Sequence, residues 1–246
     1  ITCRDWSSDV CSSDLLDLLA SPEAFALAGG TAALAFEGRY AKNRAVDIGK
    51  LLPKGVRWQG AALYVGAGTT FQEIIEAPEA PAALKAAAAT MVNRNTRNRA
   101  TVGGNIAAAK SCSSLAPLFL ALGAAVEYQK RGKAPATKPL SEWLEAPAGI
   151  VLSLRAAIEP GTMVATGRAS RTAADVAIAT AACAFRLDGG RLAALRVAVG
   201  GFSAHAAARA DIAALFEGKP LPSKADMEKA VDRKSTRLNS SHGKLS

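Results

Sequence analysis

The sequence is poor in residues that hold metals or form disulfide networks. Its 246 residues include four cysteines and two histidines, with no CxxC pair and no HExxH motif. Cys112 and Cys183 are the two that lie away from the chain ends, about seventy positions apart. This pattern excludes a disulfide framework, a zinc site, and an iron–sulfur cluster held by a cysteine quartet of this chain.

Aromatic residues and long apolar runs are also scarce. Phe, Trp and Tyr make up 5% of the chain, and no run reaches the length of about 18 apolar residues that a membrane-spanning helix needs. The formal net charge is +9, but the basic residues are scattered, and few aromatic side chains lie among them to stack on bases. We therefore expect no nucleic-acid partner, no membrane association, and a location in the cytoplasm, where thiols stay reduced.

Both ends of the chain read as translated sequencing adapter. Residues 5–15 read DWSSDVCSSDL and residues 232–242 read DRKSTRLNSSH; codons can be chosen so that the DNA of one is the reverse complement of the other. We interpret 1–15 and 232–246 as non-native scars, with native residues missing beyond them. The alternative is two polar tails. The scars carry charges of −2 and +3, which leaves +8 for the other 216 residues and favours an anionic cofactor or an acidic partner.

The central part is apolar enough for a core, since the chain is 50% hydrophobic and 21% charged. Short apolar runs, caps and breakers predict alternating strands and helices before residue 160. The predicted strands are 25–28, 45–48, 56–59, 62–66, 124–129 and 150–158. The predicted helices are 31–39, one opened by Thr69 and Thr70, 82–92 after Pro81, an alanine-rich one after 103–104, and 115–122, interrupted early by Pro117. Residues 130–139 are predicted to be a surface loop.

The pattern changes near residues 159–161. The sequence DGGR (188–191) between two apolar runs predicts a β-hairpin over 176–199. Ala208, Ile212, Leu215 and Phe216 then share one face of an amphipathic helix. Residues 162–231 are therefore predicted to form a separate β-β-α unit.

Two glycine pairs stand at apparent helix entrances, in 28–32 (AGGTA) and 101–105 (TVGGN). Glycine permits a close approach of the backbone, and exposed amides at a helix start suit a phosphate or a diphosphate. Neither pair fits GxGxxG, and no GK(S/T) is present, so the Rossmann and P-loop interpretations are excluded. Each pair alone is more typical of a structural turn, and one extended diphosphate ligand shared by both is the alternative.

Several segments, in order and spacing over nearly all of 16–231, resemble the FAD-binding medium subunit of the molybdenum hydroxylases. That family includes xanthine dehydrogenase and carbon monoxide dehydrogenase. The segments are LAGGT (27–31), VDIGKL (46–51), VGAGTTFQEI (65–74), TRNRATVGGNIAAA (96–109) and LAPLFLALGAAVE (115–127). ASRTAAD (169–175) resembles part of the family's C-terminal flavoprotein domain. The chain is most similar to the shorter xanthine-dehydrogenase-like members.

The resemblance implies an α+β fold: a two-lobed FAD-binding domain of the vanillyl-alcohol-oxidase or PCMH type over 16–160, and a small C-terminal domain of antiparallel sheet and helix over 161–231. It also implies which residues contact FAD. These are Leu27, Ala28, Gly29, Gly30, Thr31 and Ala32 around the pyrophosphate; Thr101, Gly103, Gly104 and Asn105 on the flavin side; Met91 and Val92 near the ring or ribityl chain; Ser114; Val151 and Leu152 at the ring or adenine end; and Arg168 near the isoalloxazine.

Two positions depart from the family pattern. Ser114 stands where the family commonly has an aspartate that bonds the cofactor, and Ala32 replaces a polar residue. Each departure removes a hydrogen bond worth about 0.5–1.5 kcal/mol. We expect either a lowered FAD affinity or compensation by another residue.

Other reactive residues have plainer interpretations. Cys112 and Cys183 are interpreted as small buried apolar side chains, and His205 as a surface or capping residue at the start of a helix. The cluster of Arg94, Arg97 and Arg99 fits a phosphate or partner contact as well as it fits a solvated face. No residue of the chain is predicted to be catalytic or to bind a metal.

By resemblance, the chain is an oxidoreductase subunit that carries FAD. A molybdopterin-binding large subunit would oxidise an N-heterocycle or an aldehyde, and a small subunit with two [2Fe–2S] clusters would pass electrons to FAD here and then to NAD+ or another acceptor. Two alternatives stay open. One is a flavin-free scaffold subunit of the same complex, suggested by Ser114 and Ala32. The other is a stand-alone FAD oxidase, disfavoured because no histidine and no substrate domain accompany the glycine turns.

Overall fold

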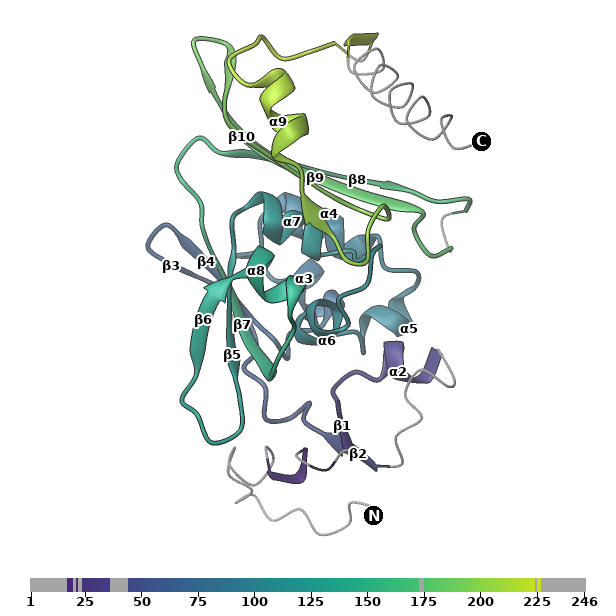
Figure 1. Cartoon of the computed structure of the whole chain (residues 1–246). Helices are drawn as coiled ribbons and strands as arrows, with labels where there is room; N and C mark the ends of the chain where they lie inside the picture. The colour runs from purple at the N-terminus through teal and green to yellow at the C-terminus, as the bar shows by residue number, and fades with distance from the viewer. Residues whose placement is uncertain are drawn as a thin grey trace, which may run out of the picture.

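The computed structural model of the chain describes residues 17–19, 21, 24–35, 44–172, 175–223 and 225–226. The two segments interpreted as adapter scars lie outside the described residues. Figure 1 shows a small strand pair at the N-terminal end, a five-stranded sheet with helices beside it, and a second sheet above those helices. The α+β class predicted from the sequence is confirmed.

The N-terminal lobe contains two parallel strands joined through a helix. They are β1 (Ala24–Leu27) and β2 (Arg44–Asp47), with α2 (Thr31–Ala35) between them in the chain. Parallel neighbours need a crossover connection, and the glycine turn followed by α2 begins that connection. The predicted strands and turn are confirmed here; the predicted end of the helix at 39 lies outside the described residues.

The central sheet has the order β3-β4-β7-β5-β6, and every neighbouring pair is antiparallel. Its strands are β3 (Val56–Gln59), β4 (Ala62–Gly66), β5 (Ala125–Gln129), β6 (Ala136–Pro139) and β7 (Ile150–Ala157). The prediction of a loop over 130–139 is wrong for its last four residues. β6 pairs with β5 at the sheet edge, where Pro139 at the strand end is tolerated because no outer neighbour needs its missing N–H.

Short helices cover one side of this sheet. They are α3 (Phe71–Glu76), α4 (Ala82–Ala89), α5 (Arg94–Arg97), α6 (Val102–Ala107), α7 (Ala116–Ala121) and α8 (Leu140–Glu145). Three predictions are corrected. α4 ends at Ala89 rather than 92. The glycine pair 103–104 lies within α6 rather than before it. Pro117 does not interrupt α7, because it sits in the first turn, where a missing N–H costs nothing.

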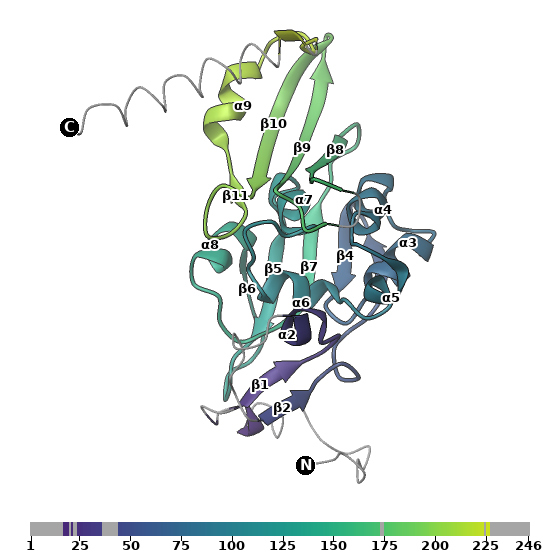
Figure 2. The ribbon, with the colours of Figure 1, turned by 90° about the vertical axis from the view of Figure 1, so that its right-hand side faces the viewer.

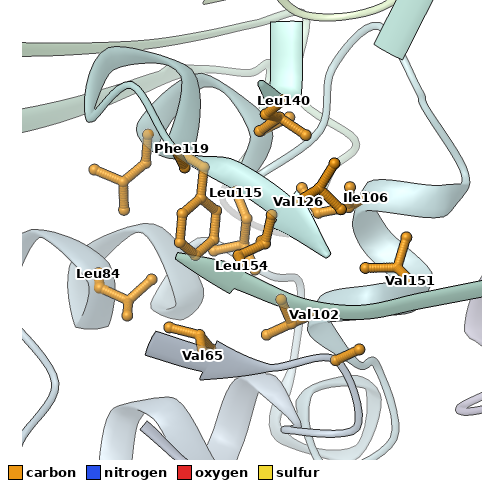
Figure 3. Packing of buried hydrophobic residues seen from close by; sticks show 14 of the residues in the cluster. Val65, Leu84, Val102, Ile106, Leu115, Phe119, Val126, Leu140, Val151 and Leu154 are labelled. Carbon is orange, nitrogen blue, oxygen red and sulfur yellow. The ribbon is translucent and has the colours of Figure 1, made fainter. Parts of the chain in front are cut away.

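The core lies between these helices and the sheet. Figure 3 shows Phe119 of α7 and Leu115, the residue before that helix, close to Leu154 of β7 and Val126 of β5, with Val65 of β4 and Leu84 of α4 on one side. All six side chains are buried. Burying each large one contributes about 1.5–3 kcal/mol relative to exposure, so this layer fixes where the loops at its rim lie.

The C-terminal unit is a four-stranded antiparallel sheet in the order β11-β10-β9-β8 with one helix. Its elements are β8 (Met163–Ala169), β9 (Ala179–Asp188), β10 (Arg191–Gly200), β11 (Ala207–Ala208) and α9 (Ala210–Phe216). Figure 2 shows this sheet beside α7 and α4, which its strands contact. The hairpin and helix are confirmed, but β8 and β11 were missed. Because Ala207 and Ala208 pair with β10, the helix starts at Ala210, and His205 does not begin it.

Candidate cofactor site

The first glycine turn lies against Arg99 and Ala100, the two residues that directly precede the second turn about seventy positions later. Arg99 Nε donates a hydrogen bond to the Gly29 carbonyl at 3.2 Å. A Cβ added at Gly29 would lie 1.7 Å from the Arg99 carbonyl oxygen, so only glycine fits there. The fold therefore supports one shared site rather than two unrelated turns.

The segment 65–70 supports the second turn. The amides of Val102 and Gly103 donate to the carbonyls of Thr69 and Ala67, at 2.9 and 2.8 Å. A Cβ at Gly103 would lie 2.7 Å from the Ala67 Cβ. Gly103 is thus required by close packing within the protein, and its side of the helix does not face a ligand.

Residues 48–55, which follow β2, hydrogen-bond both to the first turn and to the segment 65–70. Ile48 N donates to the Leu27 carbonyl at 2.8 Å, and Gly68 N donates to the Pro53 carbonyl at 2.8 Å. Thr69 is buried, and its hydroxyl oxygen accepts a hydrogen bond from Gly55 N at 2.8 Å. Four of the five segments that carry the family resemblance are thus joined by contacts at or beside the two glycine turns. The fifth segment contains α7, which packs in the core.

The first turn offers backbone donors. Gly30 adopts a φ of 73°, a left-handed conformation that glycine enters without strain. The amides of Gly29 and Gly30 donate to no described residue, and the exposed guanidinium of Arg99 lies beside them. Free amides next to a positive charge suit a diphosphate.

The second turn offers a different surface, and one expectation about it is wrong. Its amides are not exposed, because Val102 and Gly103 are bonded as above and Gly104 N donates to the Thr101 hydroxyl at 3.1 Å. Gly104 is exposed, and a Cβ there would contact only that hydroxyl, at 2.9 Å. The second turn therefore presents a smooth glycine surface next to Asn105, whose Oδ1 accepts from Ser113 and Leu115.

Ser114 and Arg168 come together across the two structural units. Both line a narrow cleft between α4, α7 and the sheet strands β8 and β9, along with Thr90, Thr166 and Thr180. Its interior has room for about one water molecule, so a flavin ring would not fit inside it. Arg168 Nη2 donates to the Asp175 carbonyl, which ties the guanidinium to the loop after β8.

The remaining predicted residues differ in how exposed they are. Val151 is 3% exposed and packs in the core, as Figure 3 shows, so its side chain cannot reach a ligand in this arrangement. Leu152 lies at a β-bulge, and its carbonyl accepts from Ala67 N at 2.9 Å. Met91 packs against the core, while the Val92 side chain is 41% exposed. Their contacts with FAD stay predictions.

The arginine cluster divides. Arg97 is half-buried and donates to Gln72 Oε1 at 3.1 Å and to the Met91 carbonyl at 3.0 Å, so it is a structural brace. Arg94 is exposed and pairs with Glu76 at 3.4 Å. Arg99 is the member that reaches the glycine turns.

Cys112, Cys183 and His205 make none of the hydrogen bonds described above for the two turns. Cys112 and Cys183 are free and partly exposed, less buried than expected. Burial raises the pKa of the Cys183 thiol, a shift that a backbone hydrogen bond from Ala165 partly offsets, so this thiol stays protonated at neutral pH. His205 Nε2 faces Glu145 at 3.5 Å.

Among the residues that the structure describes, no group of three or more His, Cys, Asp or Glu could hold a metal ion. None of the described helices is both long and apolar enough to cross a membrane.

Sequence reasoning missed Ser113, which lies within this site. Its buried hydroxyl joins Asn105 to the start of α7. A serine three residues before a helical segment is a capping signal, but nothing in the local sequence links it to a residue eight positions earlier.

The residues present fit FAD. The dinucleotide needs N–H donors and positive charge at its pyrophosphate, which Arg99 and the first-turn amides, bonded to no described residue, would provide. Its flavin half needs an approach without obstructing side chains and a polar partner, which Gly104 and the Asn105 amide provide. Adjacency of the two turns lets one extended molecule use both.

Comparison with known families gives two matches along the chain. Residues 3–165 match the FAD binding domain in molybdopterin dehydrogenase, and residues 165–244 match the CO dehydrogenase flavoprotein C-terminal domain. The "Uncharacterized protein YgfM" of Escherichia coli K12 is 32% identical over 184 residues, which is 75% of this chain and 68% of that protein.

Solved structures share the fold. A carbon monoxide dehydrogenase of Hydrogenophaga pseudoflava, in a form that lacks the Mo-pyranopterin moiety of the molybdenum cofactor, has a TM-score of 0.78 at 25% identity, covering 87% of this chain and 79% of that one. Quinoline 2-oxidoreductase of Pseudomonas putida 86 has a TM-score of 0.75 at 22% identity, covering 86% and 78%. With both family matches, the site and the fold in agreement, the chain belongs to the FAD-binding subunits of the molybdenum hydroxylases, an oxidoreductase component whose cofactor is FAD.

Proposed function

We propose that this chain is the electron-transfer subunit of a xanthine-dehydrogenase-like molybdenum hydroxylase. It would receive electrons from a small [2Fe–2S] subunit and pass them to NAD+ or another acceptor, while a molybdopterin-binding large subunit oxidises the substrate. The observation that carries the proposal is the contact between Gly29 and Arg99, which joins the two glycine turns of a family member into one site.

The division of labour follows from the chemistry of the cofactor and the residues. When bound, FAD takes up and gives away electrons singly or in pairs, which suits it to connect one-electron iron–sulfur donors with a two-electron acceptor such as NAD+. Arg99 and the free amides of Gly29 and Gly30 would bind the pyrophosphate. Gly104 would leave the flavin face unobstructed, and Asn105 would donate a hydrogen bond from its amide.

Arg168 adds a charge at the cleft between the two structural units. A guanidinium near the isoalloxazine stabilises negative charge gained on reduction and raises the tendency of the flavin to accept electrons. Its tie to the Asp175 carbonyl would hold it in place. We retain Arg168 and Ser114 as proposed cofactor contacts at the mouth of the cleft.

The lining of the cleft favours electron transfer over a stand-alone oxidase. An oxidase that removes a proton and a hydride from its substrate needs a general base within hydrogen-bond reach. No histidine or carboxylate is among the described residues that line the cleft. Substrate choice would therefore belong to the molybdenum subunit, and we propose the cytoplasm as the compartment.

The test uses the chain co-expressed with its genomic neighbours. We expect a complex that contains molybdopterin and ferredoxin-like subunits and one FAD per copy of this chain, measured by absorbance after release of the flavin. Under anaerobic conditions, the substrate of the complex should reduce the flavin, and the rates of reoxidation by NAD+ and by a quinone should identify the acceptor.

Three outcomes would contradict the proposal. A well-folded complex without flavin would identify a scaffold subunit instead. Turnover of a substrate by the isolated, flavin-loaded chain would identify a self-sufficient oxidase. Flavin that stays oxidised while the molybdenum centre turns over would show that electrons leave by another route.

A further inference from the structure

The orientation of the Asn105 amide is fixed by the protein. Leu115 N, which can only donate, points at Asn105 Oδ1 at 3.3 Å. A flipped amide would set two donors against each other, so the assignment of oxygen and nitrogen does not depend on any movable proton. The amide NH2 is therefore the end that points away from the loop 110–114.

The NH2 end is available to a ligand. No described residue accepts a hydrogen bond from it. Among the described residues, no buried side-chain nitrogen lacks a partner, so this nitrogen is not sealed inside the protein. It lies one residue after exposed Gly104, on the helix that carries the second turn.

Ser113 supplies the second hydrogen bond to Asn105. Its Oγ accepts from Ala116 N at 3.1 Å, so its own proton is left to donate to Asn105 Oδ1, at 2.6 Å. Ser113 is 3% exposed, which shields this bond from water and strengthens it. One side chain thus accepts from the first amide of α7 and holds the amide of the glycine motif.

The C-terminal sheet clamps the loop from the other side. The Thr180 hydroxyl on β9 donates to the Ser113 carbonyl at 3.1 Å, and Thr180 is itself buried. Gly201 N donates to the Ser111 carbonyl at 3.0 Å. A Cβ on Gly200 would lie 2.3 Å from that carbonyl oxygen, so the sheet closes on the loop backbone directly.

We propose that Ser113 is a positioning residue for FAD: its hydroxyl holds Asn105 so that the amide NH2 faces the cofactor. This rests on the proposed placement of FAD at 101–105. The C-terminal sheet thereby influences a cofactor contact that lies in the other domain.

The test measures FAD affinity of apo-protein by quenching of flavin fluorescence, together with the position of the bound flavin's visible absorption band. Ser113→Ala should weaken FAD binding about tenfold, the loss of one well-formed hydrogen bond, and shift the band. Ser113→Thr keeps the hydroxyl. Its FAD affinity should lie within about threefold of wild type, the lower end of what one such bond contributes, and its absorption band should return to the wild-type position. Ser111→Ala removes a hydroxyl two residues away that bonds Gly201 N, and should leave both unchanged.

A double-mutant cycle separates positioning from general damage to the fold. Ser113→Ala removes the acceptor for the first amide of α7 as well, so it should lower the melting temperature by a few degrees whatever its role. If Ser113 acts through Asn105, Ser113→Ala should have no further effect on FAD affinity in an Asn105→Ala background. Additive losses of affinity would overturn the proposal.

The outcomes distinguish this inference from the proposed function. FAD binding by the wild type with unchanged affinity and absorption in Ser113→Ala would refute the positioning role alone. Failure of the folded wild type to bind FAD would refute the proposed function. Asn105→Asp sharpens the result, since it keeps an acceptor for Ser113 and Leu115 but replaces the NH2 donor, and it should weaken FAD binding more than Ser113→Ala.

Discussion

The two glycine turns look alike in the sequence and differ in what they present. The first, around Gly29 and Gly30, has amides that bond no described residue. The second, around Gly103 and Gly104, has its amides bonded to Thr69, Ala67 and Thr101. The first turn has backbone amides that suit an anion. In the second turn the backbone amides are already bonded within the protein, and Gly104 is exposed.

The difference teaches that paired glycines need separate explanations. Gly29 and Gly103 are glycines because neighbouring protein atoms occupy the space of a side chain. Gly30 is glycine because of its positive φ. Gly104 lies in a helix and is exposed, and the contact that a Cβ there would make is with the Thr101 hydroxyl, at 2.9 Å.

The largest effect should follow Gly29→Ala. The added Cβ would lie 1.7 Å from a backbone oxygen, which cannot move without separating the turns. We expect a loss of about 3 kcal/mol or more in the free energy of unfolding, and loss of FAD binding. Urea denaturation and flavin titration measure both. Gly167→Ala, where a Cβ meets nothing within 4 Å, is the stability control; an equal, small effect of both changes would refute the contact.

Gly103→Ala should come next. Its Cβ would lie 2.7 Å from the Ala67 Cβ and 3.1 Å from the Ala67 carbonyl oxygen, so the backbone must shift, but by less than at Gly29 because both distances are longer. We expect destabilisation by about 1–3 kcal/mol, with FAD affinity falling only as far as the turn is displaced. A second change, Ala67→Gly, removes the contact between the two Cβ atoms and should recover part of the stability. No recovery would show that strain arises elsewhere.

Gly104→Ala should affect FAD affinity more than it affects stability, the opposite of what we expect for Gly103→Ala. Alanine favours a helix over glycine by about 0.5–1 kcal/mol, which offsets the close approach to the Thr101 hydroxyl, so stability should change little. FAD affinity should fall, because the new methyl group stands on the exposed face. Parallel measurements of unfolding and flavin binding check this. Unaltered FAD affinity would place the flavin away from Gly104.

The smallest effect is a pH dependence of stability, and it concerns the second turn alone. Thr70, which bridges to Thr101, caps α3 in a box with Glu73. Burial would raise the pKa of Glu73, but its hydrogen bonds with Thr70 and the charge of Lys54 outweigh this and hold the pKa below its ordinary value of 4.5. The ionised carboxylate of Glu73 therefore stabilises the fold at any pH above its ordinary pKa. This contribution disappears as the pH falls through the lowered pKa of the folded state.

Glu73→Gln isolates this charge, because glutamine also completes a capping box. Glu73 is about half exposed, so the difference from wild type should stay below about 1 kcal/mol at pH 7. Urea denaturation from pH 7 into acid should show the two proteins converging. A difference that grows in acid would have the wrong sign for this mechanism.

Sequence reasoning succeeded where a pattern is local. The strands β3 and β4 match their predicted bounds, and the hairpin of β9 and β10 follows from DGGR. It failed where pairing with a distant strand decided the outcome. β6 was taken for a loop, and β11 for part of a helix, because each is a short edge segment held mainly by its neighbour.

The same limit applies to the site. The sequence pointed to residues 27–32 and 101–105, and to Arg99 as one member of a cluster. It could not show that Arg99 bonds Gly29, or that Val151 is buried in the core, because both depend on contacts across tens of residues.

The sequence by itself determined the family, the cofactor and the elements whose signals are local, since motifs and caps act through neighbours along the chain. The tertiary structure decided which glycines are required by packing or by a positive φ, and which one stays exposed. It also decided which way the Asn105 amide points, and that residues of the C-terminal sheet hold its loop. Those facts depend on atoms brought within hydrogen-bond distance by the folded core, a distance that no spacing in the sequence specifies.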